Sequence, residues 1–173
     1  MAQATLPRPA NADDLKKVNE LIKDIRIAMM TTVEADGSLR SRPMATQEAE
    51  FDGDLWFFSH ETAPKVDEIH QDRRVNLSYA GNKENTWVSV SGTASVVRDR
   101  ATMDAFWNPA LKAWFPEGLD DPDLALLKVD VEQAEYWDTS SSKIVHAVGF
   151  VKAIATGKQY EPGDNEKLDL QAV

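Results

Sequence analysis

In the first part of the chain, the apolar residues have the spacing of a helix up to residue 26 and the pattern of β-strands after it. Over residues 11–26 they recur every three or four positions, which predicts an amphipathic helix. β-branched and aromatic runs at 27–33, 39–50 and 55–59 are separated by turns that contain Asp-Gly, a pair that tolerates the positive φ of tight hairpins. We therefore expect three successive antiparallel strands after the first helix.

The rest of the chain continues with alternating patterns interrupted by short helical ones. Pro64, a plausible first helical residue after the hydroxyls of Ser59 and Thr62, predicts a helix within 59–72. Six or seven strands in hairpin order, with helices inserted between them, predict a mainly β fold, an antiparallel β-barrel with flanking helices. The remaining predicted elements are strands at 74–80, 86–97, 124–131 and 134–137, helices at 99–106 and 144–156, and a turn-rich excursion over 108–122.

The length of the chain fits one domain that buries its own core. We expect residues 1–173 to form a single domain, with an ordered core over 11–158 and flexible ends at 1–10 and 159–173. No apolar run is long enough to cross a bilayer, and the N-terminus lacks the pattern of a signal peptide. The expectation is a soluble, cytoplasmic protein.

Composition excludes several kinds of partner and chemistry. A formal net charge of −10 disfavours binding to nucleic acid or to an anionic membrane surface. The chain has no cysteine, which excludes disulfides, thiolate metal sites and cysteine nucleophiles. Its three histidines lack the spacing of metal ligands, so we expect no metal site, while a single axial histidine for haem stays open.

The strongest candidate for a binding site is the junction between the strand at 55–59 and the following helix. Ser59, Thr62 and Lys65 bring hydroxyls and a lysine to a helix N-terminus, where free N–H groups and the helix dipole favour phosphate. Arg42, on a neighbouring strand, can add a bidentate contact to the same phosphate. The alternative is a capped helix with a surface lysine and an exposed arginine, and spacing alone does not separate the two interpretations.

Several motifs, in order and spacing, resemble the pyridoxamine phosphate oxidase family and, more closely, its bacterial general stress proteins. The likeness extends over residues 13–158. It implies a split β-barrel of six to seven antiparallel strands that forms a homodimer and holds FMN in the cleft between two subunits. The motifs are Arg-Pro-Met at 42–44, Trp-Phe-Phe-Ser at 56–59, the segment 65–76, Trp-Val-Ser-Val-Ser-Gly at 87–92, the strand at 128–137, and, for the general stress proteins, 114–118 and 145–149.

The resemblance also implies roles for particular residues. Arg42 and Lys65 match the arginine and lysine near the flavin phosphate, and the backbone of Pro43 and Met44 matches the stretch that follows the flavin ring. Trp114 and Phe115 are expected, with Trp137, to cover the ring. The complete expected cofactor site is Arg42, Pro43, Met44, Phe58, Ser59, Thr62, Lys65, Trp87 and Trp137.

Three departures from the family pattern bear on function. Pro64 replaces the arginine of an Arg-Lys pair, which removes one charge-assisted phosphate contact. Gln47 stands where the true oxidases have a substrate lysine, and no arginine follows Arg100 to hold the vitamin substrate. The sequence therefore predicts that the protein does not oxidise pyridoxamine phosphate.

Two classes of function stay open. In the first, the protein is a flavin-dependent oxidoreductase acting on a small molecule, and it positions a cofactor that carries the electrons. In the second, it is a non-catalytic protein that binds or sequesters flavin. A split barrel holding a deazaflavin or haem is a further alternative, and the absorption spectrum of the purified protein distinguishes it from the other two.

Overall fold

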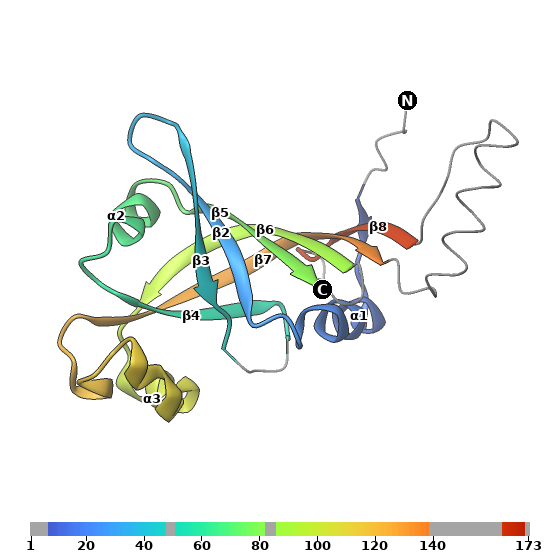
Figure 1. Ribbon diagram of the computed structural model, residues 1–173. Helices are drawn as coiled ribbons and strands as arrows, with labels where there is room; N and C mark the ends of the chain where they lie inside the picture. Colours follow the sequence, from blue (N-terminus) through green and yellow to red (C-terminus); the bar gives the residue numbers. More distant parts are fainter. Residues whose placement is uncertain (1–6, 48–50, 82–85, 139–163, 172–173) are drawn as a thin grey trace, which may run out of the picture.

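The computed structural model describes residues 7–47, 51–81, 86–138 and 164–171, which form one curled sheet with helices at its ends (Figure 1). The strands are β1 (Arg8–Pro9), β2 (Ile27–Val33), β3 (Leu39–Ala45), β4 (Asp54–His60), β5 (Arg74–Gly81), β6 (Thr86–Val97), β7 (Leu124–Asp138) and β8 (Asp164–Asp169). The helices are α1 (Ala12–Ile22), α2 (Pro64–Gln71) and α3 (Arg100–Phe106), with short 3-10 turns η1 (Pro109–Ala113) and η2 (Gly118–Asp120). The fold is mainly β, as the sequence pattern predicts.

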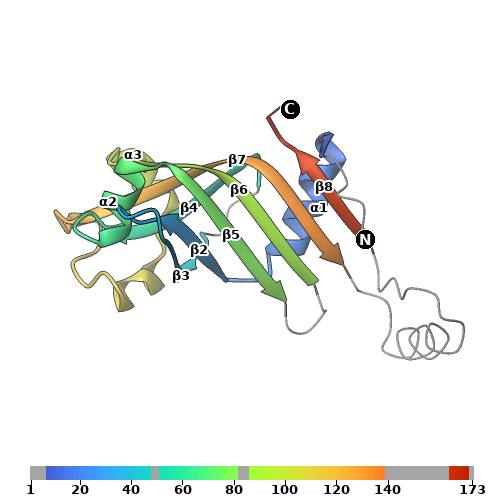
Figure 2. The ribbon, with the colours of Figure 1, turned by 90° about the horizontal axis from the view of Figure 1, so that it is seen from above.

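Six strands form a barrel that is open along one seam. Neighbouring strands run in the order β4-β7-β6-β5-β2-β3, and every pair in this series is antiparallel. The view from above shows α2 and α3 at one end of the curled sheet and α1 at the other (Figure 2). Between the two edges, the Gln47 N–H donates to the Trp56 carbonyl at 3.1 Å. The barrel is therefore split between β3 and β4.

The pairing of β4 corrects the expected hairpin order. Instead of following β3 as its neighbour, β4 pairs along its whole length with β7, from Asp54 opposite Asp130 to His60 opposite Leu124. Adjacent apolar residues of β4 serve different cores, because Phe57 is buried inside the barrel and its neighbour on the chain faces the cluster beneath α3. A strand with two apolar faces is stable where both faces are buried. Beside β7, one face of β4 packs into the barrel core and the other into the cluster beneath α3.

The strand β7 is continuous where the sequence predicts two strands. Gly92 of β6 faces Val131, while the preceding residue of β6 faces Gln133, so Glu132 is the extra residue of a β-bulge. A Cβ atom at Gly92 would lie 2.1 Å from the carbonyl oxygen of Asp130, so a larger residue does not fit there. The bulge interrupts the alternation along β7, which is why the pattern resembles two strands.

Parts of both chain ends lie in the sheet, contrary to the expectation that 1–10 and 159–173 are flexible. β8 pairs antiparallel with the second half of β7, and β1 pairs parallel with β8. The sheet therefore has eight strands, more than the six or seven expected. β8 carries one deeply buried apolar side chain, Leu168 at 0% exposure, among polar residues. Such a sequence gives little strand signal of its own.

The three described helices lie where the sequence predicts them, although α1 is shorter than predicted. Asn11 caps α1, and the Asp14 carboxylate accepts a hydrogen bond from the backbone N–H of Asn11, which completes a capping box. α1 ends at Ile22, before the predicted end at residue 26. α2 begins at Pro64, but neither predicted hydroxyl caps it. The helix predicted at 144–156 lies outside the described residues.

Two apolar clusters stabilise the barrel and its flank. The larger fills the barrel, where Met30, Leu77 and Val90 are fully buried. The smaller lies against the other face of β4 and contains Phe58 and Phe115. Among the described helices, none is both long enough and apolar enough to span a membrane.

Candidate functional site

The split between β3 and β4 contains a pocket of about 360 Å³. β3 contributes Pro43 and Met44, β4 contributes Phe58 and Ser59, and α2 contributes Lys65. All five are residues that the sequence predicts for the site, and the fold brings them together from three separate elements. The volume falls within the range of small-molecule sites, about 300–1,000 Å³.

One end of the pocket is polar and carries a lysine. The Lys65 Nζ atom donates a hydrogen bond to Ser59 Oγ at 3.0 Å, and Ser59 is 2% exposed. Burial, reinforced by the nearby positive charge of Arg42, lowers the pKa of the Lys65 ammonium. No carboxylate side chain belongs to the described lining of this pocket, although the whole chain has a net charge of −10. A half-buried ammonium in these surroundings is stabilised by a bound anion.

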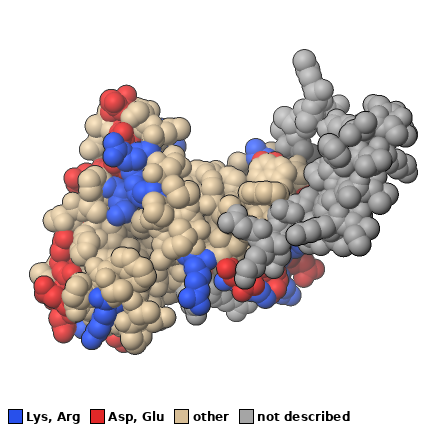
Figure 3. Space-filling model, in the orientation of Figure 1, with Lys and Arg blue, Asp and Glu red and all other residues tan. Residues whose placement is uncertain are grey.

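Arg42 lies beside this polar end, and its charge already has a partner. Its guanidinium donates to the Glu68 carboxylate at 2.8 Å and to the Thr32 hydroxyl, which in turn donates to Glu68. If Arg42 contacts a phosphate as predicted, it does so while also paired with the buried Glu68 carboxylate. Figure 3 shows basic side chains gathered over the β2–β3 hairpin and α2, on one face of an acidic chain.

The turn that leads into α2 is fixed by Asp123. Its carboxylate accepts hydrogen bonds from the Thr62 backbone N–H at 2.9 Å and from the Thr62 hydroxyl at 2.7 Å, and the latter lowers the pKa of Asp123. His60 Nδ1 lies 3.4 Å from the same carboxylate, and the His60 ring lies beside Phe115. His60 lines the pocket, whereas Thr62, a predicted site residue, does not.

The remaining wall of the pocket is apolar and largely aromatic. Phe58 and Phe115 lie with their ring centroids 6.2 Å apart, and Leu111 lies among the same lining residues. Trp114 also lines the pocket and is 64% exposed, which is unusual for so large an apolar side chain. Trp114 and Phe115, which are expected to cover the ring, both line this pocket. The pocket thus combines a cationic end with a surface suited to a flat ring.

Trp87 and Trp137 lie away from this pocket. They face each other across β6 and β7, are 46% and 39% exposed, and do not line the pocket within this subunit. Three more exposed apolar side chains, Ile27, Met29 and Leu39, project from the same outward face of the sheet, as the register shows. Within this subunit, the structure therefore does not bring the two tryptophans together with the predicted site residues that line the pocket.

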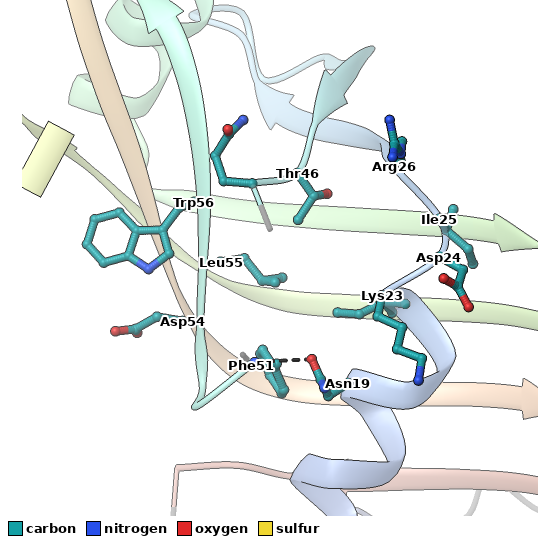
Figure 4. Close-up of a pocket in the computed structure, with 12 residues that line it drawn as sticks. Asn19, Lys23, Asp24, Ile25, Arg26, Thr46, Phe51, Asp54, Leu55 and Trp56 are labelled. Carbon is teal, nitrogen blue, oxygen red and sulfur yellow. Dashed lines mark hydrogen bonds between the residues drawn. The ribbon is translucent and has the colours of Figure 1, made fainter. Parts of the chain in front are cut away.

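A larger hollow of about 540 Å³ lies between α1 and the ends of β3 and β4 (Figure 4). Its lining carries both charges, with Lys23, Asp24 and Arg26 on the α1 side and Asp54 across the hollow on β4. None of the predicted site residues lines it, and the mixed charges give no preference for an anion. We therefore identify the smaller pocket as the candidate site.

Several residues of the site carried no recognisable signal in the sequence. Ile27, Ala45 and Leu111 line the pocket through long-range packing, and Asp123 and Glu68 act through partners on other elements.

In the part of the chain that the structure describes, no cluster of three or more histidine or acidic side chains is arranged to hold a metal ion.

Fold and pocket together define the class: a split β-barrel protein with a pocket at the split. The model of the family described as pyridoxamine 5'-phosphate oxidase like matches residues 13–161. The chain belongs to this family, as its sequence motifs predict.

The similar proteins include general stress proteins. Protein bli-3 of Neurospora crassa is 31% identical, in an alignment that covers 87% of this chain and 80% of that protein. The crystal structure of a general stress FMN/FAD binding protein from Xanthomonas citri is 30% identical, with a TM-score of 0.66 over 76% of this chain and 93% of that one. A general stress family protein from Xanthomonas campestris pv. campestris is 33% identical, with the same TM-score over 77% and 92% of the two chains.

Proposed function

We propose that this protein binds FMN in the pocket between β3 and β4. The observation that carries the proposal is the combination of Lys65 and Ser59 at one end with an aromatic wall beside them. FMN has the matching chemistry, with a phosphate at one end and a flat apolar ring at the other. The similarity to a Xanthomonas citri protein named for binding FMN or FAD supports a flavin.

The open edges of the barrel also suit a flavin. Among the described strands, β3 pairs only with β2, and β4 pairs only with β7. Each edge therefore has backbone N–H and C=O groups that the sheet does not use, and a flavin ring carries donors and acceptors to meet them. Pro43, Met44 and Phe58 would lie along the ring, while Lys65 and Ser59 would hold the phosphate.

In this proposal the protein is a flavin-dependent oxidoreductase. The flavin supplies the electron transfer when it is bound, and the protein binds the phosphate, orients the ring and excludes water. Phe58, Phe115 and Trp114 form the apolar surface that would limit water around the ring.

The proposal includes a homodimer with the flavin at the subunit cleft. Its support is the outward face of the sheet, where Ile27, Met29, Trp87 and Trp137 are all exposed by 39% or more. Ile27 belongs both to that face and to the pocket wall, as does Pro43, the cross-strand partner of Met29. A second copy that covers this apolar face would therefore also reach the open side of the pocket.

Two measurements test the proposed function. Titration with FMN, followed by flavin fluorescence and calorimetry, should reach about one FMN per chain, and absence of binding at micromolar protein would reject the proposal. The FMN-loaded protein is then mixed with a nicotinamide donor without oxygen. Rapid bleaching of the flavin supports an oxidoreductase, whereas an inert flavin supports the non-catalytic binding protein.

A further inference from the structure

Arg42 is held in a buried ion pair next to the proposed phosphate site. The side chains of Arg42 and Glu68 are only 17% and 9% exposed, and their N–O distance is 2.8 Å. Thr32, which is fully buried, accepts a hydrogen bond from Arg42 and donates one to Glu68. The single positive charge of Arg42 is therefore already matched by a carboxylate that water screens poorly.

Glu68 also lies close to the lysine proposed to hold the phosphate. It follows Lys65 by three residues on α2, so the two side chains are neighbours on the helix surface. The pKa of Lys65 responds to both members of the ion pair, because Arg42 lowers it and Glu68 raises it. A phosphate held by Lys65 would thus be near two cations. One is the Lys65 ammonium, and the other is the Arg42 guanidinium, whose charge Glu68 balances.

Building on the proposed function, we propose that Glu68 competes with the flavin phosphate for Arg42 and thereby sets how strongly the pocket selects FMN. A carboxylate repels a nearby phosphate. The Glu68 carboxylate also accepts one N–H of the Arg42 guanidinium, and Thr32, which donates to Glu68, accepts another. The penalty grows with the charge of the phosphate. FMN carries a phosphate monoester with nearly two negative charges at pH 8, each phosphate of FAD carries one, and riboflavin carries none.

Glu68→Gln tests this competition because the amide keeps the size of the carboxylate and one acceptor oxygen, while it removes the charge. One oxygen can serve both present contacts, since Thr32 and Arg42 donate to the same oxygen of Glu68. We expect the variant to bind FMN about tenfold more tightly, FAD more tightly by a smaller factor, and riboflavin unchanged. Dissociation constants for the three flavins are measured at pH 8 by fluorescence, on wild-type and variant protein. A general change in packing would shift all three flavins alike, so the ratio between them isolates the charge.

Two further variants separate the proposed competition from other effects. Glu61→Gln is the matched control, since Glu61 is a partly exposed carboxylate near α2 that pairs with Arg98 and does not line the pocket. It should leave all three affinities unchanged. In an Arg42→Gln background, Glu68→Gln should give a smaller gain for FMN, because relief of the repulsion remains but there is no guanidinium to release. If Glu68→Gln fails to fold, Glu68→Asp, which shortens the side chain, should shift the affinities in the same direction.

The outcomes also distinguish this inference from the proposed function. Unchanged or weaker FMN binding by Glu68→Gln, with the wild type binding FMN normally, would overturn the competition and leave the flavin site standing. An equal gain for riboflavin and FMN would overturn it as well. If neither the wild type nor the variant binds any of the three flavins, both proposals fail.

Discussion

Replacing Lys65 with methionine should remove the phosphate contact while keeping most of the side-chain volume. The lost interaction is a charge-assisted hydrogen bond from a half-buried ammonium, worth about 1.5–3 kcal/mol. This energy corresponds to a loss of roughly 10- to 150-fold in FMN affinity. Riboflavin has no phosphate, so its affinity should not change. The hydrogen bond to Ser59 at 3.0 Å is also lost, and among the described residues it is the only hydrogen bond that the ammonium donates.

Thermal unfolding converts this loss of affinity into a measurable shift. FMN at a hundred times its dissociation constant stabilises the wild type by about 2.7 kcal/mol, and after a hundredfold loss of affinity the same concentration gives about 0.4 kcal/mol. For a chain of this length, 1 kcal/mol moves Tm by about 2–4 °C. We therefore expect a rise of roughly 5–10 °C in the wild type and about 1 °C in the variant. An unchanged shift, or an equal loss of riboflavin binding, would refute the assignment of Lys65 to the phosphate.

The same residue gives a prediction for the protein without flavin. Burial lowers the pKa of Lys65 in the folded state below its usual value of 10.5, so the unfolded chain binds more protons between the two values. The free energy of unfolding should therefore rise with pH in that window, and Lys65→Met should lose this part of the rise. Lys16→Met is the matched control, since Lys16 is 74% exposed on α1. Urea unfolding between pH 8 and 10.5 measures the slopes.

Three more predictions follow from other parts of the molecule. Met29→Asp, which places a charge on the exposed sheet face, should convert the proposed dimer to a monomer in light scattering, and a wild-type monomer would contradict that assembly. Asp14→Asn should lower the free energy of unfolding by about 1–2 kcal/mol at pH 7 and by less at pH 2. The hydrogen bond from Arg8 lowers the pKa of Asp14, so the stabilisation by this carboxylate is lost as pH falls through that pKa. Pyridoxamine phosphate should be oxidised far more slowly than about one per second, given Gln47, and detection of pyridoxal phosphate at that rate would contradict the prediction.

The local elements of this fold could be predicted from the sequence because their signals are local. Asn11 and the apolar spacing after it define α1, and Pro64 marks the start of α2. The strand β8 could not be predicted in the same way, since it owes its place to pairing with β7 and to one buried leucine. Its stabilising contacts come from elements distant in the sequence.

The candidate site shows the same division. Lys65 and Ser59 are six residues apart, and a strand followed by a helix was enough to bring them together. The partner of Arg42 could not be predicted, because Glu68 is 26 residues away and the contact depends on how α2 packs across the end of the barrel. The charge pattern of the sequence identified Arg42 as a candidate but gave no sign that Glu68 neutralises it.

The error in the predicted strand order concerns the feature on which the site depends. Had β4 paired with β3 as a hairpin, the barrel edges would have bonded to each other, and the backbone groups that now border the pocket would have been used in the sheet. Because β4 pairs with β7 instead, two strand edges face one gap, and exposed edges favour further pairing or aggregation unless something covers them. In the proposed function, a flat ligand with hydrogen-bonding edges would cover the gap from within, and a second subunit on the sheet face of Met29 and Trp137 would cover it from outside. Flavin binding and dimerisation are therefore expected to stabilise each other, since each one covers polar backbone and apolar surface that the other leaves exposed.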